Sequence, residues 1–284
     1  MWFTEEAITA WRAEPRTTRG GQPRYSALAI RTALTLRAVF RLALRQTEGL
    51  IGSILQLLGL DLAVPDHSTL SRRAETLEVP RLQSRTGPIH LLVDSTGLRL
   101  CGPGEWLIEK HGTQRRRAWR KLHIGVDAQT GEILASELTT SDVDDGSQAE
   151  PLLDQIAAPL NSFTGDGAYD QAGIYDTVAK RNPDADVIVP PRSTAVPNAM
   201  TESARTQRDR HPQSIAEHGR MGWQKRSGYN RRALVEASIS RLKRVFRKTL
   251  RSRTDRRRKT EVAIAVHALN LMIELGRPKS VRIA

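Results

Sequence analysis

The sequence has a single cysteine, Cys101, among its 284 residues. One thiol excludes an intramolecular disulfide, and it also excludes zinc fingers and zinc ribbons that are built from cysteine pairs. The seven histidines lack the H-x-E, H-E-x-x-H and H-x-H spacings that bring imidazoles together on one metal. The sequence therefore predicts neither a disulfide-bonded protein nor a metal centre made from histidine and cysteine.

Long apolar runs are also missing. Arginines interrupt residues 27–60 and polar residues interrupt 261–276, so no stretch approaches the roughly 20 apolar residues that span a bilayer. The first residues, MWFTEEAITAW, lack the basic and apolar regions of a secretory signal. We therefore expect a soluble, cytoplasmic protein that has no membrane partner.

Positive charge, in contrast, is in excess. The net charge is +13, and residues 201–260 hold 19 Lys and Arg against 5 Asp and Glu, so the rest of the chain is nearly neutral. A short basic run is usually a solvated surface. A segment of this length is more typical of a site for nucleic acid, because binding to phosphates releases condensed counterions.

The first part of the sequence has helical periodicity. Apolar residues recur at i, i+3 and i+4 through residues 24–78, and Pro65 with Asp66 predicts a turn and cap before a short polar helix that carries Arg72 and Arg73. This pattern is typical of a helix-turn-helix, but an ordinary helical hairpin gives the same pattern. The polar residues 79–88 predict a domain boundary, and hence a small all-α domain over residues 1–85.

A different order follows in residues 86–284. Strand patterns occur at residues 89–98, 118–127 and 132–140, with a turn at 127–131 that predicts antiparallel pairing. Helix, strand, helix, strand and closing helices come next. The order β-β-β-α-β-α-β-α predicts an α/β domain with a mixed sheet of the ribonuclease H-like type. The 38 residues between Pro190 and Tyr229 predict loops and a short helix, since they are too few for a separate sheet domain.

Three acids lie in positions that suit phosphoryl-transfer chemistry. The motifs LLVDSTG and TGDGAYD present Asp94 and Asp166 where an apolar strand is expected to end, although each alone is typical of a turn. Glu236 is the single acid in the basic helical stretch YNRRALVEASISRLKRVF. Divalent ions that act on phosphates require hard oxygen ligands from separate elements, and these acids can supply them.

The helix around Glu236 has two distinct faces at about 100° per residue. Four polar residues share one narrow face: Tyr229, Arg232, Glu236 and Lys243. An apolar stripe lies beside it and is expected to pack on the sheet: Val235, Ile239, Leu242 and Phe246. A simple salt bridge between Arg232 and Glu236 is an alternative, but it does not explain why Tyr229 and Lys243 share the same line.

Other polar residues are expected to be structural. Asp127 lies in the predicted hairpin turn, Asp142, Asp144 and Asp145 lie in a polar loop, and Asp170 lies beside a helix start. Trp223 either stacks on a displaced base or packs within its own domain.

The spacing of Tyr229, Arg232, Glu236 and Lys243 matches the Y-x2-R-x3-E-x6-K signature of bacterial insertion-sequence transposases. With Asp94 and Asp166, nearly the whole chain resembles a DDE transposase of insertion sequence family five. The resemblance implies a ribonuclease H-like domain in which Asp94, Asp166 and Glu236 are the catalytic residues and the metal ligands. It also implies Mg²⁺ as cofactor, with Mn²⁺ able to substitute, and nucleic-acid contacts from Tyr229, Arg232 and Lys243.

The function implied is metal-dependent nicking at the inverted-repeat ends of an insertion sequence, followed by transfer of the 3′-hydroxyl ends into target DNA. Residues 1–85 would bind the ends, and the protein would act on double-stranded DNA in the nucleoid as a homodimer or higher oligomer. Relatives often have a short segment before the equivalent of WFTEEA, so we expect the sequence to lack a little of the amino terminus. Two alternatives are a ribonuclease H-like nuclease without strand transfer, and a catalytically silent DNA-binding protein, either a decayed copy or a repressor.

Overall fold

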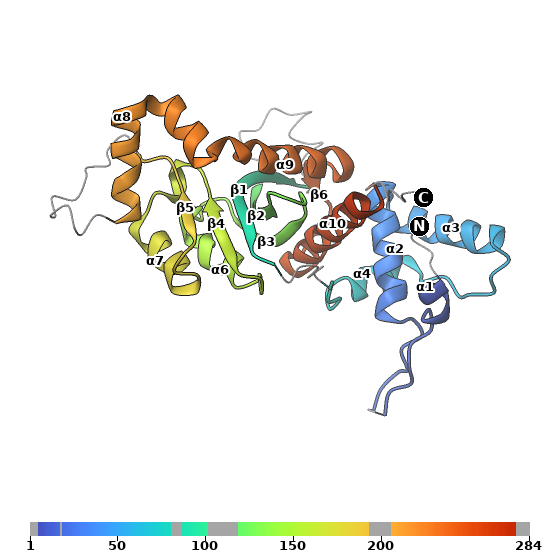
Figure 1. Ribbon diagram of the computed structural model, residues 1–284. Coiled ribbons are helices and arrows are strands. Elements are labelled where there is room, and N and C mark those ends of the chain that lie inside the picture. The colour runs from blue at the N-terminus through green and yellow to red at the C-terminus, as the bar shows by residue number, and fades with distance from the viewer. Residues whose placement is uncertain (1–4, 18, 81–86, 102–118, 193–205, 277–284) are drawn as a thin grey trace, which may run out of the picture. The chain divides into compact units, whose positions relative to one another are not determined.

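The chain forms two compact units, each with its own hydrophobic core (Figure 1). The structure, a computed structural model, describes residues 5–17, 19–80, 87–101, 119–192 and 206–276. One unit comprises residues 1–81, 100–116 and 242–284, and the other comprises 82–99 and 117–241. No helix in the described ranges is both long and apolar enough to cross a membrane.

The first unit is helical, as the apolar periodicity predicted. Its helices are α1 (Glu5–Thr9), α2 (Ala27–Val39), α3 (Leu44–Leu57), α4 (His67–Arg73) and α10 (Asp255–Leu275). Helix α2 packs against α3, α4 and α10, and their apolar faces bury Ile30, Ile51, Leu70 and Ile264. A short strand, β6 (Thr249–Leu250), also belongs to this unit. The helical start of the chain is therefore completed by a helix from near its end.

The connection between α3 and α4 bears on the helix-turn-helix interpretation. Asp66 caps α4 as predicted, since its carboxylate accepts hydrogen bonds from the N–H groups of Ser68 and Thr69 (both 2.9 Å). However, residues 58–66 separate the two helices, which is longer than the 3–4-residue turn of that motif. The geometry favours the helical hairpin, and DNA contact by α4 stays a prediction.

The second unit is built on the predicted mixed sheet. Its strands are β1 (Ile89–Leu100), β2 (Trp119–Asp127), β3 (Ile133–Thr140), β4 (Leu160–Thr164) and β5 (Asp186–Ile188). They lie in the order β3-β2-β1-β4-β5, with antiparallel pairing through β3, β2 and β1 and parallel pairing through β1, β4 and β5. The predicted turn is also present, because Asp127 accepts hydrogen bonds from Gln129 and Thr130, and Gly131 adopts a φ of 72°.

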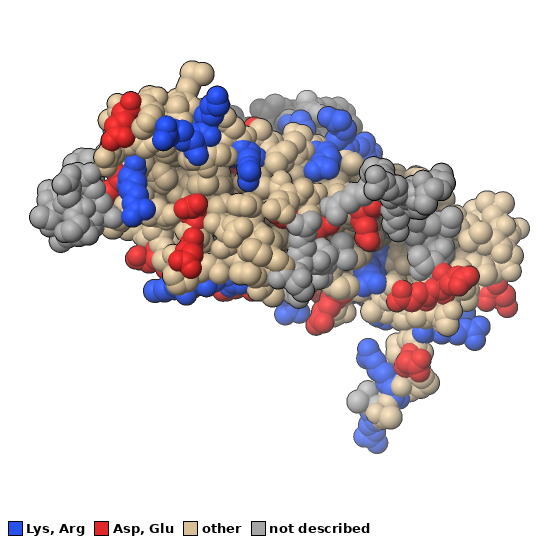
Figure 2. All heavy atoms as spheres, viewed as in Figure 1, with Lys and Arg blue, Asp and Glu red and all other residues tan. Residues whose placement is uncertain are grey.

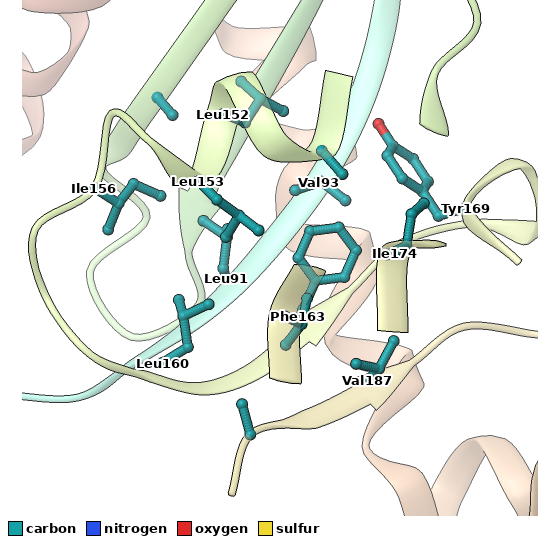
Figure 3. Close-up of a cluster of buried hydrophobic side chains, with 14 of the residues drawn as sticks. Leu91, Val93, Leu152, Leu153, Ile156, Leu160, Phe163, Tyr169, Ile174 and Val187 are labelled. Carbon is teal, nitrogen blue, oxygen red and sulfur yellow. The ribbon is translucent and has the colours of Figure 1, made fainter. Parts of the chain in front are cut away.

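Helices cover this sheet. They are α6 (Ala149–Leu153), α7 (Ala172–Arg181), α8 (Gln207–Ser227) and α9 (Ala233–Phe246), with 3₁₀ turns η1 (Gly146–Gln148), η2 (Gly167–Tyr169) and η4 (Tyr229–Arg232). The core is formed by side chains from β1, β4, β5, α6 and the turn after β4 (Figure 3); they include Leu91, Val93, Leu152, Leu153, Phe163, Tyr169 and Val187. The last residues of α9, 242–246, belong to the first unit.

Two sequence-based boundaries were wrong. The segment before Tyr229 contains the 21-residue helix α8, interrupted at Gly219 (φ 72°), where loops and a short helix were predicted; residues 193–205 lie outside the described ranges. The helix that carries Glu236 starts at Ala233, after a 3₁₀ turn. Because a 3₁₀ turn has 3.0 residues per turn, the uniform 100° projection does not apply to Tyr229 and Arg232.

The core assignment gives a direct test of stability. Replacing the fully buried Leu152 with Ala should lower the free energy of unfolding of this unit by about 2–5 kcal/mol, because the change leaves a cavity. Met221, on α8, is 84% exposed, so Met221→Ala should change the free energy of unfolding by less than about 0.5 kcal/mol. Chemical denaturation followed by circular dichroism measures both, and equal effects would contradict the assigned core.

Candidate active site

Asp94 lies on β1, and Asp166 follows the end of the neighbouring parallel strand β4. The last pair in the β1–β4 register is Leu92 with Thr164, and each acid lies two residues beyond its member of that pair. Asp166 follows the end of β4, as predicted to within two residues. Asp94 does not lie at a strand end, because β1 continues to Leu100 as the partner of β2. The strand register thus brings together two carboxylates that are far apart in sequence.

The turn after β4 fixes Asp166. Its Oδ1 accepts a hydrogen bond from the N–H of Ala168 (2.9 Å), which caps η2. The ring of Tyr169 is buried edge-on against Phe163 and lies over Gly165, where an added Cβ would come within 2.7 Å of the ring. Gly165 is therefore required for the close packing that holds this turn against the sheet.

An ion pair between the buried Asp170 and the partly exposed Arg208 stabilises the same turn. The Asp170 carboxylate accepts hydrogen bonds from Nε and Nη2 of Arg208 on α8 (2.6 and 3.2 Å) and from the N–H of Arg192 (2.9 Å). The Arg192 guanidinium also donates to the carbonyl oxygens of Gly167 and Ala168. Burial alone would raise the pKa of Asp170, but the bonds from Arg208 and Arg192 outweigh it and lower the pKa. As predicted, Asp170 is structural, although it does not cap the helix that follows.

The three candidate acids share one cation, Arg232. Its Nη2 lies 3.1 Å from Oδ2 of Asp94 and 3.8 Å from Oδ2 of Asp166, and its Nη1 lies 2.6 Å from Oε1 of Glu236. The salt bridge between Arg232 and Glu236 that sequence reasoning treated as an alternative is therefore present. It is one contact of a four-residue cluster that joins β1, the turn after β4, and the start of α9.

Burial and charge act in opposite directions in this cluster. Burial raises the pKa of Asp94. The charge of Arg232 and the hydrogen bond from the N–H of Ser95 lower this pKa, and the charges of Asp166 and Glu236 raise it. The net effect is a raised pKa. For Arg232, burial lowers the pKa, but the neighbouring acids and Tyr229 outweigh this effect and raise it. The exposed fraction of the side chains increases from 14% for Asp94 to 38% for Asp166 and 56% for Glu236, so the cluster opens to solvent on one side.

The donor set suits a hard divalent ion. Three carboxylates from three elements provide the oxygens that Mg²⁺ and Mn²⁺ prefer. The pKa of Asp94 is raised mainly by burial, and the charges of Asp166 and Glu236 add to this effect. As the side chains stand, no group of three or more Asp, Glu, His or Cys residues within the described ranges is arranged to hold a metal. Arg232 supplies the positive charge instead, so a metal ion would compete with it for the same oxygens.

Tyr229 and Trp223 form an aromatic support beside the acids. Their rings lie 5.2 Å apart, and the indole N–H of Trp223 donates to Nδ1 of His211 (3.0 Å), whose Nε2 donates to the Val187 carbonyl (2.7 Å). Trp223 is 2% exposed, which confirms the packing interpretation over base stacking. Burial is the main cause that raises the pKa of Tyr229.

Two candidates from the sequence remain, Lys243 and the basic segment of residues 201–260. Lys243 lies seven residues after Glu236, in the part of α9 that belongs to the other unit. Within the basic segment, Arg257 pairs with Glu75 (3.0 Å) and Arg258 pairs with Asp255 (2.7 Å), so part of its charge serves structure. Sequence analysis did not single out Gly165, Tyr169 or the Asp170–Arg208 pair. The close spacing of Gly165, Asp166 and Tyr169 in TGDGAYD was the one signal that pointed to the first two.

Comparison with known protein families identifies the family of the chain. Two family models match the chain, and each describes a transposase DDE domain; one covers residues 1–103 and the other covers residues 85–271. The second match spans well over half of the sequence, so the chain belongs to the DDE transposases. The predicted fold class is confirmed, since the mixed sheet is that of a ribonuclease H-like domain with a helical region before it. Transposition, DNA as the partner and divalent-metal chemistry follow from the family.

The Asp170–Arg208 pair gives a pH-dependent test. The folded-state pKa of Asp170 is lowered, so its stabilisation is present above the unfolded-state pKa and is lost as the pH falls through the folded-state value. At pH 7, Asp170→Asn should cost roughly 2 kcal/mol, less than for a fully buried pair because Arg208 is about a third exposed. This cost should shrink towards pH 3 in denaturation experiments. The control is Asp176→Asn at an exposed position of α7. A stability cost for Asp170→Asn that does not change with pH would contradict the assigned ion pair.

Proposed function

We propose that this DDE transposase nicks DNA at the inverted-repeat ends of an insertion sequence and joins the free 3′-hydroxyl ends to target DNA. The observation that carries the proposal is the gathering of Asp94, Asp166 and Glu236 around Arg232. These acids would be the catalytic residues and would hold Mg²⁺, with Mn²⁺ able to substitute. The Y-x2-R-x3-E-x6-K spacing supports assignment to insertion sequence family five.

Each part of the site has a proposed role. When bound, the divalent ions would stabilise negative charge on the attacking and leaving oxygens of an in-line displacement. The partly buried Asp94 and the turn-fixed Asp166 would provide a rigid pair of ligands, and the more exposed Glu236 would complete the group from α9. Arg232, Tyr229 and Lys243 would position phosphates of the DNA, by charge for the two cations and by a hydroxyl hydrogen bond for Tyr229.

The wider organisation is part of the same proposal. Residues 1–85 would bind the element's ends and residues 86–284 would carry the chemistry. A synapse of two ends would require a homodimer or a higher oligomer on double-stranded DNA, within the nucleoid. A nuclease without strand transfer and a silent DNA-binding protein are the competing functions. They differ in products, because the first gives nicks without joined strands and the second gives neither.

The central test removes one metal-binding charge. Glu236→Gln keeps the shape of the side chain but not its negative charge, so nicking and joining should fall by two or more orders of magnitude. DNA binding should hold or rise slightly, because one charge that repels phosphate is gone. The assay incubates the protein with Mg²⁺ and DNA that carries the element's ends, and maps the 3′-hydroxyl products.

The matched control is Glu150→Gln, an exposed glutamate on α6 outside the acid cluster, which should leave cleavage unchanged. Cleavage by Glu236→Gln at near the wild-type rate would make Glu236 only the partner of Arg232. An inactive wild-type protein that binds the ends tightly would support the silent DNA-binding function.

Arg232 gives a second test, because a metal ion and Arg232 would compete for the same carboxylate oxygens. Without DNA, Arg232→Gln should bind Mn²⁺ several-fold more tightly than the wild type, since no internal cation has to be displaced. It should also bind the cleavable end more weakly, through the lost phosphate contact. Electron paramagnetic resonance of free Mn²⁺ measures the first effect, and Arg231→Gln, an exposed neighbour, is the control. Weaker Mn²⁺ binding by Arg232→Gln would mean that Arg232 orders the ligands instead of competing with the metal.

A further inference from the structure

An arginine-bearing arm connects α1 and α2 in the helical unit. The arm, described over residues 12–17 and 19–25, carries four arginines and a single acid, Glu14. The arginines are all exposed: Arg12, Arg16, Arg19 and Arg24. Figure 2 shows these basic side chains along the arm, which in Figure 1 is the dark-blue hairpin that extends away from α2. The arm therefore presents a concentrated positive charge to solvent.

The arm is a hairpin that has no core of its own. Arg12 and Tyr25 form an isolated antiparallel bridge, and the N–H of Ala13 donates to the Arg24 carbonyl (3.4 Å). Farther out, the Gln22 side chain bonds twice to the backbone of Arg16, accepting from its N–H and donating to its carbonyl (both 2.8 Å). The two branches are thus held together by main-chain and amide hydrogen bonds and not by the arginine side chains, although the Arg24 guanidinium lies over the ring of Tyr25 (5.8 Å to the centroid).

The base of the arm is fixed in the hydrophobic core of the helical unit. Trp11 is 1% exposed and its indole N–H donates to the Ala63 carbonyl (2.8 Å), while the Tyr25 hydroxyl donates to the Val64 carbonyl (2.7 Å). Both aromatic residues belong to the buried cluster of this unit. Because both branches leave from anchored residues, the direction of the arm is set before any partner binds, which lowers the ordering cost of binding.

Helix α4 lies against the base of the arm. Nη1 of Arg73 donates to the Tyr25 carbonyl (3.0 Å). A groove of about 520 Å³ is lined from both sides, by Arg16 and Arg24 of the arm and by Thr69 and Arg72 of α4. The acid in the groove, Asp66, uses its carboxylate oxygens to cap α4. The groove therefore continues the positive surface of the arm onto α4.

Stability of the fold does not account for these charges. Among the described residues, none of the four arm arginines is ion-paired with an acid, and like charges so close in sequence repel one another. Forked guanidinium groups match phosphate oxygens and guanine edges in pairs, and the major groove of DNA is wide enough for a two-stranded ribbon. An exposed, anchored ribbon of arginines is therefore suited to duplex DNA.

We propose that the arm and the adjoining face of α4 form a duplex-DNA site. The arm lies in the major groove with its arginines on phosphates and base edges, and Arg72 contacts the flanking phosphates. The proposal rests on the proposed transposase function, and it assigns the end-binding role of residues 1–85 to one surface. Binding through this surface is a separate event from chemistry at the acid cluster, so the two can be measured independently.

The test uses the full-length protein, EDTA and duplex DNA that carries the element's ends, so that binding is measured without cleavage. Replacing Arg16, Arg19 and Arg24 with Ala should reduce the slope of log K against log salt by about 2–3, at about 0.9 for each lost phosphate contact. Affinity near 100 mM salt should fall at least about tenfold. The melting temperature should stay at the wild-type value, because the three side chains are exposed.

Two controls sharpen the result. Replacing the same three arginines with Lys should keep the salt slope but reduce the preference for the element's ends over scrambled DNA, since lysine cannot make forked base contacts. Arg45→Ala removes an exposed arginine from α3 of the same unit and should bind like the wild type, in contrast to Arg19→Ala. A wild-type salt slope in the triple Ala variant would overturn the arm proposal. Failure of the wild-type protein to cut these ends with Mg²⁺ would instead count against the transposition chemistry.

Discussion

The contact of one guanidinium with three carboxylates is the interaction on which the candidate site depends. Arg232 draws Asp94, Asp166 and Glu236 to a common point, although burial and mutual repulsion disfavour the charge on Asp94. Removing Arg232 would leave the partly buried Asp94 beside two other acids with no compensating cation, which is destabilising at buried sites. The positive charge of Arg232 offsets part of the repulsion among the three acids.

The surrounding structure serves to hold these four residues. Strand register sets Asp94 beside Asp166, and the tight turn after β4 depends on Gly165, Tyr169 and the buried Asp170 to keep its shape. The Trp223 indole packs against Tyr229, which is the first residue of the turn that carries Arg232. Rigid elements therefore present the three carboxylates, and in the proposed mechanism Arg232 would exchange a carboxylate partner for a phosphate.

Much of the sheet and the positions of two candidate acids could be predicted from the sequence, because they depend on local residue patterns. Alternation and turn residues gave β1, β2 and β3 and their antiparallel order, and the acids after apolar runs pointed to Asp94 and Asp166. Long-range pairing could not be predicted: the Asp170–Arg208 bond joins residues 38 apart, and nothing local distinguishes it from a helix cap. The 3₁₀ turn at Tyr229–Arg232 was also missed, since its sequence suits an α-helix equally well.

The most direct test of this account is a crystal structure of the protein with Mn²⁺ and cleaved end DNA, in which anomalous scattering locates the metal. The account predicts Mn²⁺ peaks at about 2.1–2.2 Å from carboxylate oxygens of Asp94, Asp166 and Glu236, with Arg232 turned to a phosphate oxygen. Peaks elsewhere, or Arg232 still bound to all three acids in the DNA complex, would contradict it.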